Sequence, residues 1–210
     1  MVRAPATLGM RLEDVDTPAL ILDLDAFETN MARLVGAVPR RVRVRAHAKT
    51  HKCAEIARRQ VAAGAVGVCC QKVSEAEAMV EGGITDVLVS NEVVGRGKLE
   101  RLAALAKRAQ LGVCVDHPDN VRELQAAMKR ASARIDVYIE LEVGMHRCGV
   151  APGEPAVALA RVITASPNLR FAGIHAYHGR AQHIRSNDER RAVIGAAAAA
   201  VRTTKGLLQK

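Results

Sequence analysis

The sequence has very few aromatic residues: phenylalanine, tyrosine and tryptophan together make up 2% of its 210 residues, and tryptophan is absent. Proteins that hold single-stranded nucleic acid stack its bases on aromatic rings. We therefore expect no nucleic acid partner. Hydrophobic residues still make up 49% of the chain, an ordinary share for a globular protein, so we expect a core built from Ala, Val, Leu and Ile.

Long apolar segments and paired cysteines are also missing. No apolar run approaches the roughly 20 residues that a membrane-spanning helix needs, and the first residues lack the apolar stretch of a signal peptide. The cysteines are odd in number and show no C-x-x-C spacing. They are Cys53, Cys69, Cys70, Cys114 and Cys148. We expect no membrane association, and reduced thiols in a cytoplasmic protein.

The formal net charge is +9, which could indicate an anionic partner. The arginines are scattered along helical patterns, however, and no basic run of five or more residues occurs. This distribution favours solvated helix faces over a nucleic-acid-binding patch.

After residue 40 the chain alternates between short apolar runs and helical patterns. The runs are VRVRAHAK, VGVCCQK, DVLVSNE, LGVCVDH, IDVYIELEVG and LRFAGIHAYHG. The helical patterns begin near Lys52, Ser74, Gly97, Asp119, Gly153 and Asp188. Such alternation predicts βαβ units and a parallel sheet.

Two architectures fit a parallel sheet of this kind. A doubly wound open sheet usually carries a G-x-G-x-x-G loop after its first strand, and no such loop occurs here. We therefore favour a partial (β/α)8 barrel with about six βα units, although a closed barrel needs eight. We expect residues 41–210 to form this incomplete barrel. We expect residues 1–40 to form a segment with one extra strand, from Pro18 to Asp25, and a helix.

Polar residues cluster where the expected strands end, and in a barrel the chemistry lies at the carboxyl ends of the strands. They are His47, Lys49, His51, Gln71, Lys72, Asn91, Glu92, Asp116, His117, Glu142, His146, Arg147, His175, Tyr177, His178 and His183. We expect these side chains to converge on one rim and to form an active site there.

Lys49 is the leading catalytic candidate within this group. A lysine at a strand end inside a barrel mouth is partly desolvated, which favours the neutral amine that forms a Schiff base. The alternative is a surface lysine that reaches into solvent. For Lys52 and Lys72, which fall at the start of loop or helix segments, solvation is the preferred interpretation.

Six motifs in order also carry a family resemblance. They are TPALILDLDAFETNM, RAHAKTHK, GVCCQKVSEAEAM, DVLVSNEV, EVGMHRCGV and GIHAYHGRAQH. The chain resembles the D-threonine aldolase and 3-hydroxy-D-aspartate aldolase group of the alanine-racemase-type pyridoxal phosphate enzymes. The resemblance runs from about Asp16 onward.

The resemblance implies roles for individual residues. Lys49 matches the lysine that binds pyridoxal 5'-phosphate covalently. Arg147 matches an arginine that approaches the phenolic oxygen of the cofactor, where a guanidinium makes a charge-assisted contact. The alternative for Arg147 is a structural ion pair with Glu140 or Glu142.

The substrate pocket is expected around three further residues. Tyr177 and His183 match residues that line it, and we add Gln71 from its strand-end position. We also expect Tyr177 to contact the cofactor. His183 would take the proton of the substrate's β-hydroxyl, a task that suits imidazole, although lone histidines are often structural. His47 and His51 would support Lys49; a two-histidine metal site lacks a complete ligand set.

The implied activity is retro-aldol cleavage of a D-3-hydroxy amino acid, such as D-threonine or 3-hydroxy-D-aspartate, to glycine and an aldehyde or glyoxylate. The resemblance also implies activation by a divalent metal, Mn or Mg, and a homodimer. D-serine dehydratase or racemase chemistry on the same fold, and a non-catalytic cofactor-binding fragment, are the alternatives. Because the family's glycine-rich phosphate loop and metal ligands lie beyond the matched portion, we expect this chain alone to be inactive.

Overall fold

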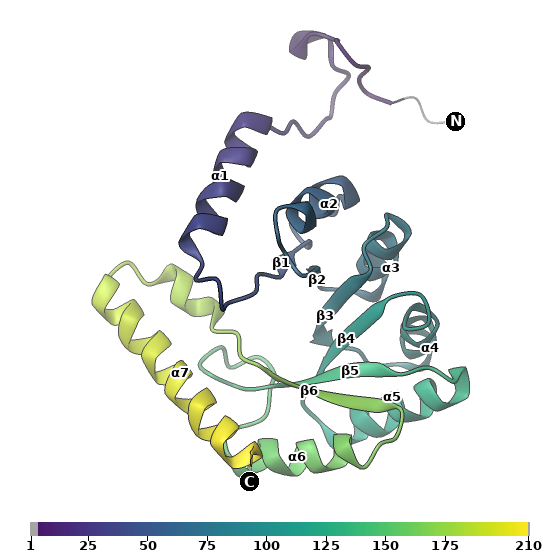
Figure 1. The fold of residues 1–210 in the computed structure, drawn as a ribbon, viewed down its shortest axis with the longest axis vertical. Coiled ribbons are helices and arrows are strands. Elements are labelled where there is room, and N and C mark those ends of the chain that lie inside the picture. Colours follow the sequence, from purple (N-terminus) through teal and green to yellow (C-terminus); the bar gives the residue numbers. More distant parts are fainter. Residues whose placement is uncertain (1–3, 210) are drawn as a thin grey trace. The chain divides into compact units, whose positions relative to one another are not determined.

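The computed structural model describes residues 4–209. The chain divides into two compact units, Met1–Val42 and Arg43–Lys210. Figure 1 labels the helices and strands of both units.

The smaller unit contains a short 3-10 helix, η1 (Leu12–Asp14), and one α-helix, α1 (Leu24–Ala37). Asp23 begins α1 as its N-cap, because its carboxylate accepts the backbone N–H of Ala26 at 2.9 Å. The expected extra strand from Pro18 to Asp25 is wrong. Residues 18–22 are irregular, and Asp23 onward belongs to the cap and the helix.

The physical reason for this difference is pairing. A strand must satisfy its backbone N–H and C=O groups on a neighbour, and no described strand pairs with this segment. Its apolar side chains face solvent as well: Leu20 is fully exposed and Ile21 is 61% exposed. The segment has the apolar pattern of a strand, but no strand among the described residues pairs with it.

The larger unit alternates strand and helix throughout. Its strands are β1 (Ala46–His47), β2 (Val68–Cys70), β3 (Asp86–Glu92), β4 (Gln110–Val115), β5 (Ile135–Glu140) and β6 (Leu169–His175). Its helices are α2 (Ala54–Ala62), α3 (Val73–Glu81), α4 (Arg96–Leu105), α5 (Pro118–Ala131), α6 (Glu154–Thr164), η2 (Gly179–His183) and α7 (Asn187–Leu208). The six expected helix starts are confirmed to within two residues.

The six strands form one parallel sheet in the order β1-β2-β3-β4-β5-β6. A doubly wound sheet reverses its strand order at a switch point, whereas here each strand pairs with the next along the chain. Helices α2 to α6 lie along the outer side of the curved sheet (Figure 1). This arrangement confirms six βα units of the barrel type.

The core lies between the sheet and these outer helices, and it is aliphatic as the composition predicts. Its fully buried large side chains include Met79, Leu102, Leu124, Ile139 and Ile163. Burying one such side chain contributes roughly 1.5–3 kcal/mol. The outer packing therefore holds the strands in place without any aromatic stacking.

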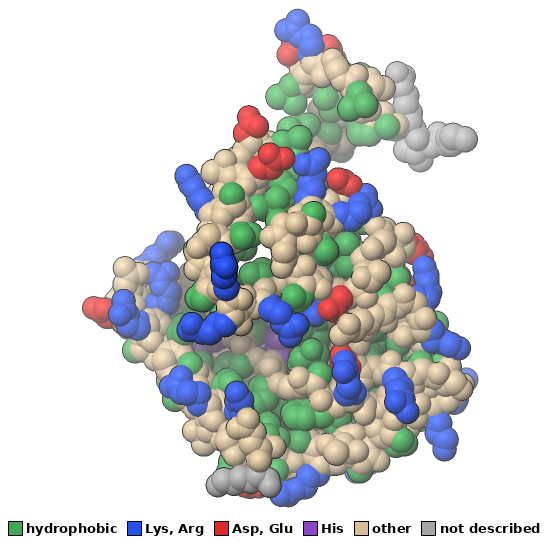
Figure 2. Space-filling model, in the orientation of Figure 1, with side chains coloured by type: hydrophobic (Ala, Val, Ile, Leu, Met, Phe, Trp, Pro, Cys, Tyr) green, Lys and Arg blue, Asp and Glu red, His purple; other side chains and the backbone are tan. Residues whose placement is uncertain are grey.

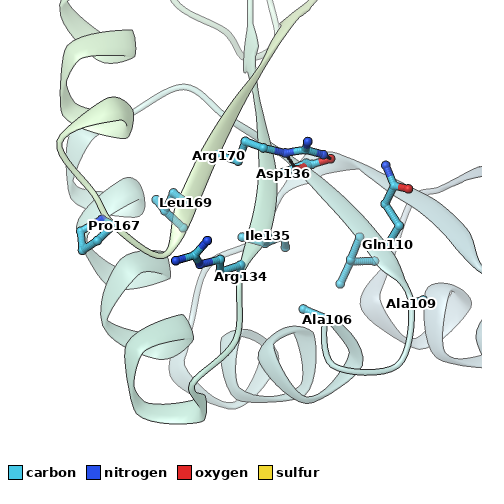
Figure 3. A pocket seen from close by; sticks show the side chains of 10 residues that line it. Ala106, Ala109, Gln110, Arg134, Ile135, Asp136, Pro167, Leu169 and Arg170 are labelled. Atoms are coloured by element: carbon cyan, nitrogen blue, oxygen red, sulfur yellow. Dashed lines mark hydrogen bonds and ion pairs between the residues drawn. The ribbon is translucent and has the colours of Figure 1, made fainter.

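The inner side of the sheet carries polar residues on β5. Along β5, Asp136, Tyr138 and Glu140 alternate with core residues, as successive strand side chains must. Near the amino ends of β5 and β6, Asp136 receives two hydrogen bonds of 2.5 Å from Arg170. This pair borders a pocket of about 450 Å³ (Figure 3). Because barrel chemistry lies at the opposite, carboxyl ends, we assign the pair to stability.

The basic charge is distributed over the surface. Figure 2 shows Lys and Arg side chains spread over the visible face without a continuous basic stripe. Several are paired on helices, such as Arg96 with Glu100 at 2.7 Å, and such exposed pairs stabilise only weakly. Within the described residues, no helix combines the length and apolar character needed to cross a bilayer.

Candidate active site

Three residues implied by the resemblance meet at the carboxyl ends of the strands. Lys49 follows β1, Arg147 lies in the loop after β5, and Tyr177 follows β6. The Lys49 Nζ atom lies 5.9 Å from the centre of the Tyr177 ring, and the Arg147 Cζ atom lies 5.8 Å from the same centre. Both distances fall within the range of cation–π attraction. The fold therefore gathers an amine, a guanidinium and a phenol from three separate loops.

The backbone at Lys49 is held while its side chain is exposed. Ala48 is buried and donates its N–H to the Cys69 carbonyl at 2.8 Å, and Lys52 donates its N–H to the Ala48 carbonyl at 2.8 Å. The Lys49 carbonyl accepts a hydrogen bond from Lys52 Nζ at 2.6 Å. The sequence predicts a partly desolvated Lys49. In the structure of residues 4–209, the Lys49 side chain is exposed instead.

Lys52 has a structural partner. Its Nζ atom lies 3.0 Å from a carboxylate oxygen of Glu75, whose other oxygen accepts the Gln71 N–H at 2.8 Å. Burial raises the pKa of Glu75, but these hydrogen bonds outweigh it and the net pKa is lowered. Lys52 thus ties the β1 loop to the start of α3. Lys72 is exposed at the N-cap of that helix, as expected for a solvated lysine.

The two histidines around Lys49, His47 and His51, accept hydrogen bonds from the backbone of its loop. His47 Nδ1 accepts the Lys49 N–H at 3.3 Å, and His47 Nε2 lies 3.3 Å from Ser90 Oγ. Burial, with a smaller contribution from the Lys49 charge, lowers the pKa of His47. His51 Nδ1 accepts the Cys53 N–H at 3.1 Å, and burial lowers its pKa too. Both rings are therefore engaged as supports, and no metal-ligand group among the described residues contains them.

The loop that carries Arg147 is fixed at both ends. Glu142 donates its N–H to the Val150 carbonyl, and Val150 donates its N–H to the Glu140 carbonyl, both at 2.9 Å. Gly149 donates its N–H to Asp116 at 3.0 Å. Gly149 has a φ of +106°, and an added Cβ would lie 2.7 Å from the Glu142 nitrogen. Position 149 therefore requires glycine.

Arg147 itself is exposed, and its pKa is raised, first by a hydrogen bond with Cys148 and then by the charges of Glu140 and Glu92. The alternative of an ion pair with Glu140 or Glu142 is not found among the described residues. Glu140 pairs with His175, and Glu142 accepts the Gly144 N–H. The guanidinium therefore remains available to a ligand.

A second cluster of polar residues lies deeper in the barrel, and the sequence analysis did not predict it. Cys114, Glu140 and His175 bring one ligand-type atom each to within 4.8 Å of one another. His175 Nδ1 is hydrogen-bonded to Glu140 Oε2, and the two residues are register partners across β5 and β6. The only sequence signal for this contact is that both residues lie at strand ends.

The two remaining candidates, Gln71 and His183, form no hydrogen bond or ion pair with the Lys49, Arg147 and Tyr177 side chains among the described residues. Gln71 directly follows β2, and its carbonyl accepts a hydrogen bond from Asn91 at 3.3 Å. His183 ends η2 and is exposed. Within residues 4–209, the His183 side chain makes no hydrogen bond, ion pair or ring contact with Lys49, Arg147 or Tyr177. The structure therefore brings together Lys49, Arg147 and Tyr177, while Gln71 and His183 remain predicted members of the site.

Comparison with known proteins places this geometry in a family. The chain is 49% identical to a D-threonine aldolase from Arthrobacter sp over 195 residues, which is 92% of this chain and 52% of the relative. It is 44% identical to a 3-hydroxy-D-aspartate aldolase from Paracoccus denitrificans (strain Pd 1222), over 98% of this chain and 54% of the relative.

The fold agrees with these sequence similarities. The crystal structure of D-threonine aldolase from Filomicrobium marinum superposes with a TM-score of 0.94 at 56% identity, and it covers 99% of this chain and 57% of that protein. The chain thus spans about half the length of the relatives that it matches. Residues 22–209 match the alanine racemase N-terminal domain. The chain therefore belongs to the alanine racemase N-terminal domain family and is similar to its D-threonine and 3-hydroxy-D-aspartate aldolases.

Proposed function

We propose that the chain carries the pyridoxal-phosphate-binding half of a carbon–carbon lyase that cleaves D-3-hydroxy amino acids. The convergence of Lys49 and Arg147 on the Tyr177 ring is the observation that supports this most directly. The aldolases from Arthrobacter and Paracoccus supply the substrate class. D-Threonine and 3-hydroxy-D-aspartate are thus the substrates to test first.

The residues fit the cofactor chemically. An exposed amine on a fixed backbone, at Lys49, can condense with an aldehyde. The Arg147 guanidinium can donate to a phenolate oxygen, and the Tyr177 ring offers a surface between the two cations. Pyridoxal phosphate supplies an electron sink for the pair that is released when a bond to Cα breaks.

The chain's own residues then act on the substrate. We propose that His183 accepts the proton of the β-hydroxyl group. As that proton leaves, the Cα–Cβ bond breaks, the β-carbon departs as an aldehyde or glyoxylate, and Cα gains a proton to give glycine. Gln71 and Tyr177 would hold the substrate in position. His183 ends the short η2 helix, which begins two residues after Tyr177.

A divalent metal, Mn or Mg, is part of the proposal because it would bind the β-hydroxyl group and promote loss of its proton. The three metal-ligand-type groups found within the described residues lie deeper in the barrel, so we do not assign this metal to them.

We further propose that residues 41–210 form an incomplete barrel and that the full assembly is a homodimer. The five free cysteines fit a reducing cytoplasm.

The experiment adds pyridoxal phosphate to the purified chain and records its visible absorbance, followed by assays for glycine from D-threonine and 3-hydroxy-D-aspartate with and without Mn²⁺. D-Serine is included, because pyruvate from it would indicate dehydratase chemistry. We expect weak cofactor binding through Lys49 and little or no cleavage by this chain alone. An unchanged spectrum in the presence of excess cofactor would refute the proposed site. Because little or no cleavage by this chain alone is expected, the cofactor spectrum, and not the cleavage assay, decides whether the proposed site exists.

A further inference from the structure

The buried pair formed by Glu140 and His175 is not explained by the cofactor contacts described above. Glu140 is 4% exposed, and its Oε2 atom is hydrogen-bonded to His175 Nδ1. A carboxylate buried this deeply is unfavourable unless a hydrogen-bond donor satisfies it. The imidazole of His175 is the group placed to donate to it.

The backbone holds both partners in place. Leu141 donates its N–H to the His175 carbonyl at 2.8 Å, and the Glu140 carbonyl accepts the Val150 N–H at 2.9 Å. These bonds join β5, β6 and the Arg147 loop around the pair. The backbone positions of Glu140 and His175 are therefore fixed by the sheet on which the candidate site is built.

The pairing determines which imidazole nitrogen carries the proton. A carboxylate can only accept a hydrogen bond, so Nδ1 must be protonated to donate to it. In the neutral ring, Nε2 is then an acceptor. The His175 side chain is 27% exposed, and its Nε2 atom makes no hydrogen bond with the described residues. Two residues further along lies Tyr177, in contact with Lys49 and Arg147.

Cys114 completes the cluster. Burial, followed by the charges of Glu140 and Glu92, raises the pKa of the Cys114 thiol well above its usual range. The hydrogen bond between Glu140 and His175 occupies one ligand-type atom of each residue. The pair is thus satisfied without a metal ion, and Zn²⁺ binding is the competing explanation that the experiments must exclude.

We propose that Glu140 is a positioning residue that fixes His175 as the Nδ1–H tautomer and directs Nε2, as a hydrogen-bond acceptor, toward the ligand held by Lys49, Tyr177 and Arg147. The inference rests on the proposed function for the identity of that ligand. An acceptor there favours a ligand that presents a hydroxyl or ammonium group, and it disfavours a carboxylate at the same position. His175 would thus contribute to substrate selection.

The first test reads the tautomer and needs no cofactor. The full chain is labelled with ¹⁵N-histidine, and the His175 ring signals are assigned by their loss in His175→Gln. We expect the Nδ1–H tautomer in the unmodified protein and in Glu140→Gln, which keeps an acceptor oxygen. Glu140→Met removes the acceptor, so the Nε2–H tautomer should become the major form. Glu92→Gln, a nearby carboxylate control, should leave the His175 signals unchanged.

Three results would overturn the proposal. One is the Nε2–H tautomer in the unmodified protein, which decides the matter even if Glu140→Met does not fold. Another is an unchanged tautomer in a folded Glu140→Met protein. The last is stoichiometric Zn²⁺ binding that is lost in Cys114→Ser and His175→Gln, since this would establish a metal site instead.

A second measurement separates this proposal from the proposed function. In absorbance titrations with pyridoxal phosphate, Glu140→Met should weaken binding about ten-fold, whereas Glu140→Gln should weaken it less. If the unmodified chain does not bind the cofactor, the proposed function fails while the tautomer result still stands. If it binds the cofactor and Glu140→Met binds equally well, the positioning role is refuted.

Discussion

At the scale of single residues, two lysines three positions apart, Lys49 and Lys52, make different contacts. Lys52 forms an ion pair with Glu75 and donates a hydrogen bond to the Lys49 carbonyl, whereas the Lys49 Nζ atom lies over the Tyr177 ring. The RAHAKTHK motif identified Lys49 through resemblance. The sequence alone could not show that Lys52 is occupied, because its partner lies 23 residues away on another element.

This difference predicts the outcome of replacing each lysine in turn. Lys49→Ala should abolish the visible absorbance that the chain gains with pyridoxal phosphate, because the condensing amine is lost. Lys52→Ala should keep the absorbance and lower the free energy of unfolding by ~1 kcal/mol, since the Lys52 side chain is 60% exposed although Glu75 is not. Absorbance titration and urea denaturation measure the two effects. Loss of the band in Lys52→Ala alone would reassign the lysine.

Arg147 gives a second prediction at this scale. Charge-assisted hydrogen bonds contribute about 1.5–3 kcal/mol, so Arg147→Ala should weaken pyridoxal phosphate binding at least about ten-fold. Thermal stability should change little, because Arg147 is exposed and forms no ion pair with Glu140 or Glu142 in the described part of the chain. Arg96→Ala, which removes an exposed helix arginine, is the control. A large drop in melting temperature with normal binding would instead indicate a structural arginine.

At the scale of elements, strands and helices follow from the sequence more reliably than the contacts between strands. Strand alternation indicates that Glu140 and His175 face the barrel interior. It does not indicate that they are neighbours, because the β5–β6 register shifts between Val137 and Tyr138. The wrongly expected strand from Pro18 to Asp25 has the same origin. Periodicity reports what a segment can form, and only a pairing partner decides whether it forms.

The loop between β1 and α2 gives a prediction about pH. Burial lowers the pKa of His47 and His51 below 6.5, so the folded protein binds protons less readily there than the unfolded chain. Their contribution to stability is fully present above about pH 6.5 and is lost as the pH falls through the lowered values. We therefore expect the free energy of unfolding to decrease between pH 7 and pH 5.5 in urea denaturation.

Paired substitutions isolate this contribution. His47→Asn with His51→Asn keeps an acceptor at the Nδ1 position and removes the titration, so it should flatten the pH dependence. Glu92 acts in the opposite sense: burial raises its pKa above 4.5, so its contribution is present at low pH and is lost as the pH rises. Glu92→Gln removes this second titration. An unchanged slope in the double variant would show that other groups control the dependence.

At the scale of the whole molecule, the sheet has two unpaired edges among the described residues. β1 pairs only with β2, and β6 pairs only with β5. Counting βα units in the sequence predicted six strands where a closed barrel has eight, and the strand order confirms that count.

The edges lead to the last prediction. Unpaired N–H and C=O groups along a strand are a template for further pairing, so the purified 210-residue chain should self-associate in a concentration-dependent way, as measured by light scattering. Ala172→Lys places a charge on an exposed position of β6 and should reduce this association, because edge lysines oppose pairing. Ala104→Lys adds the same charge at an exposed position of α4, away from either edge, and should not. Equal effects of the two substitutions would show that net charge, rather than the β6 edge, controls association. A monomeric unmodified chain at all concentrations would mean that both edges are already protected within the chain itself.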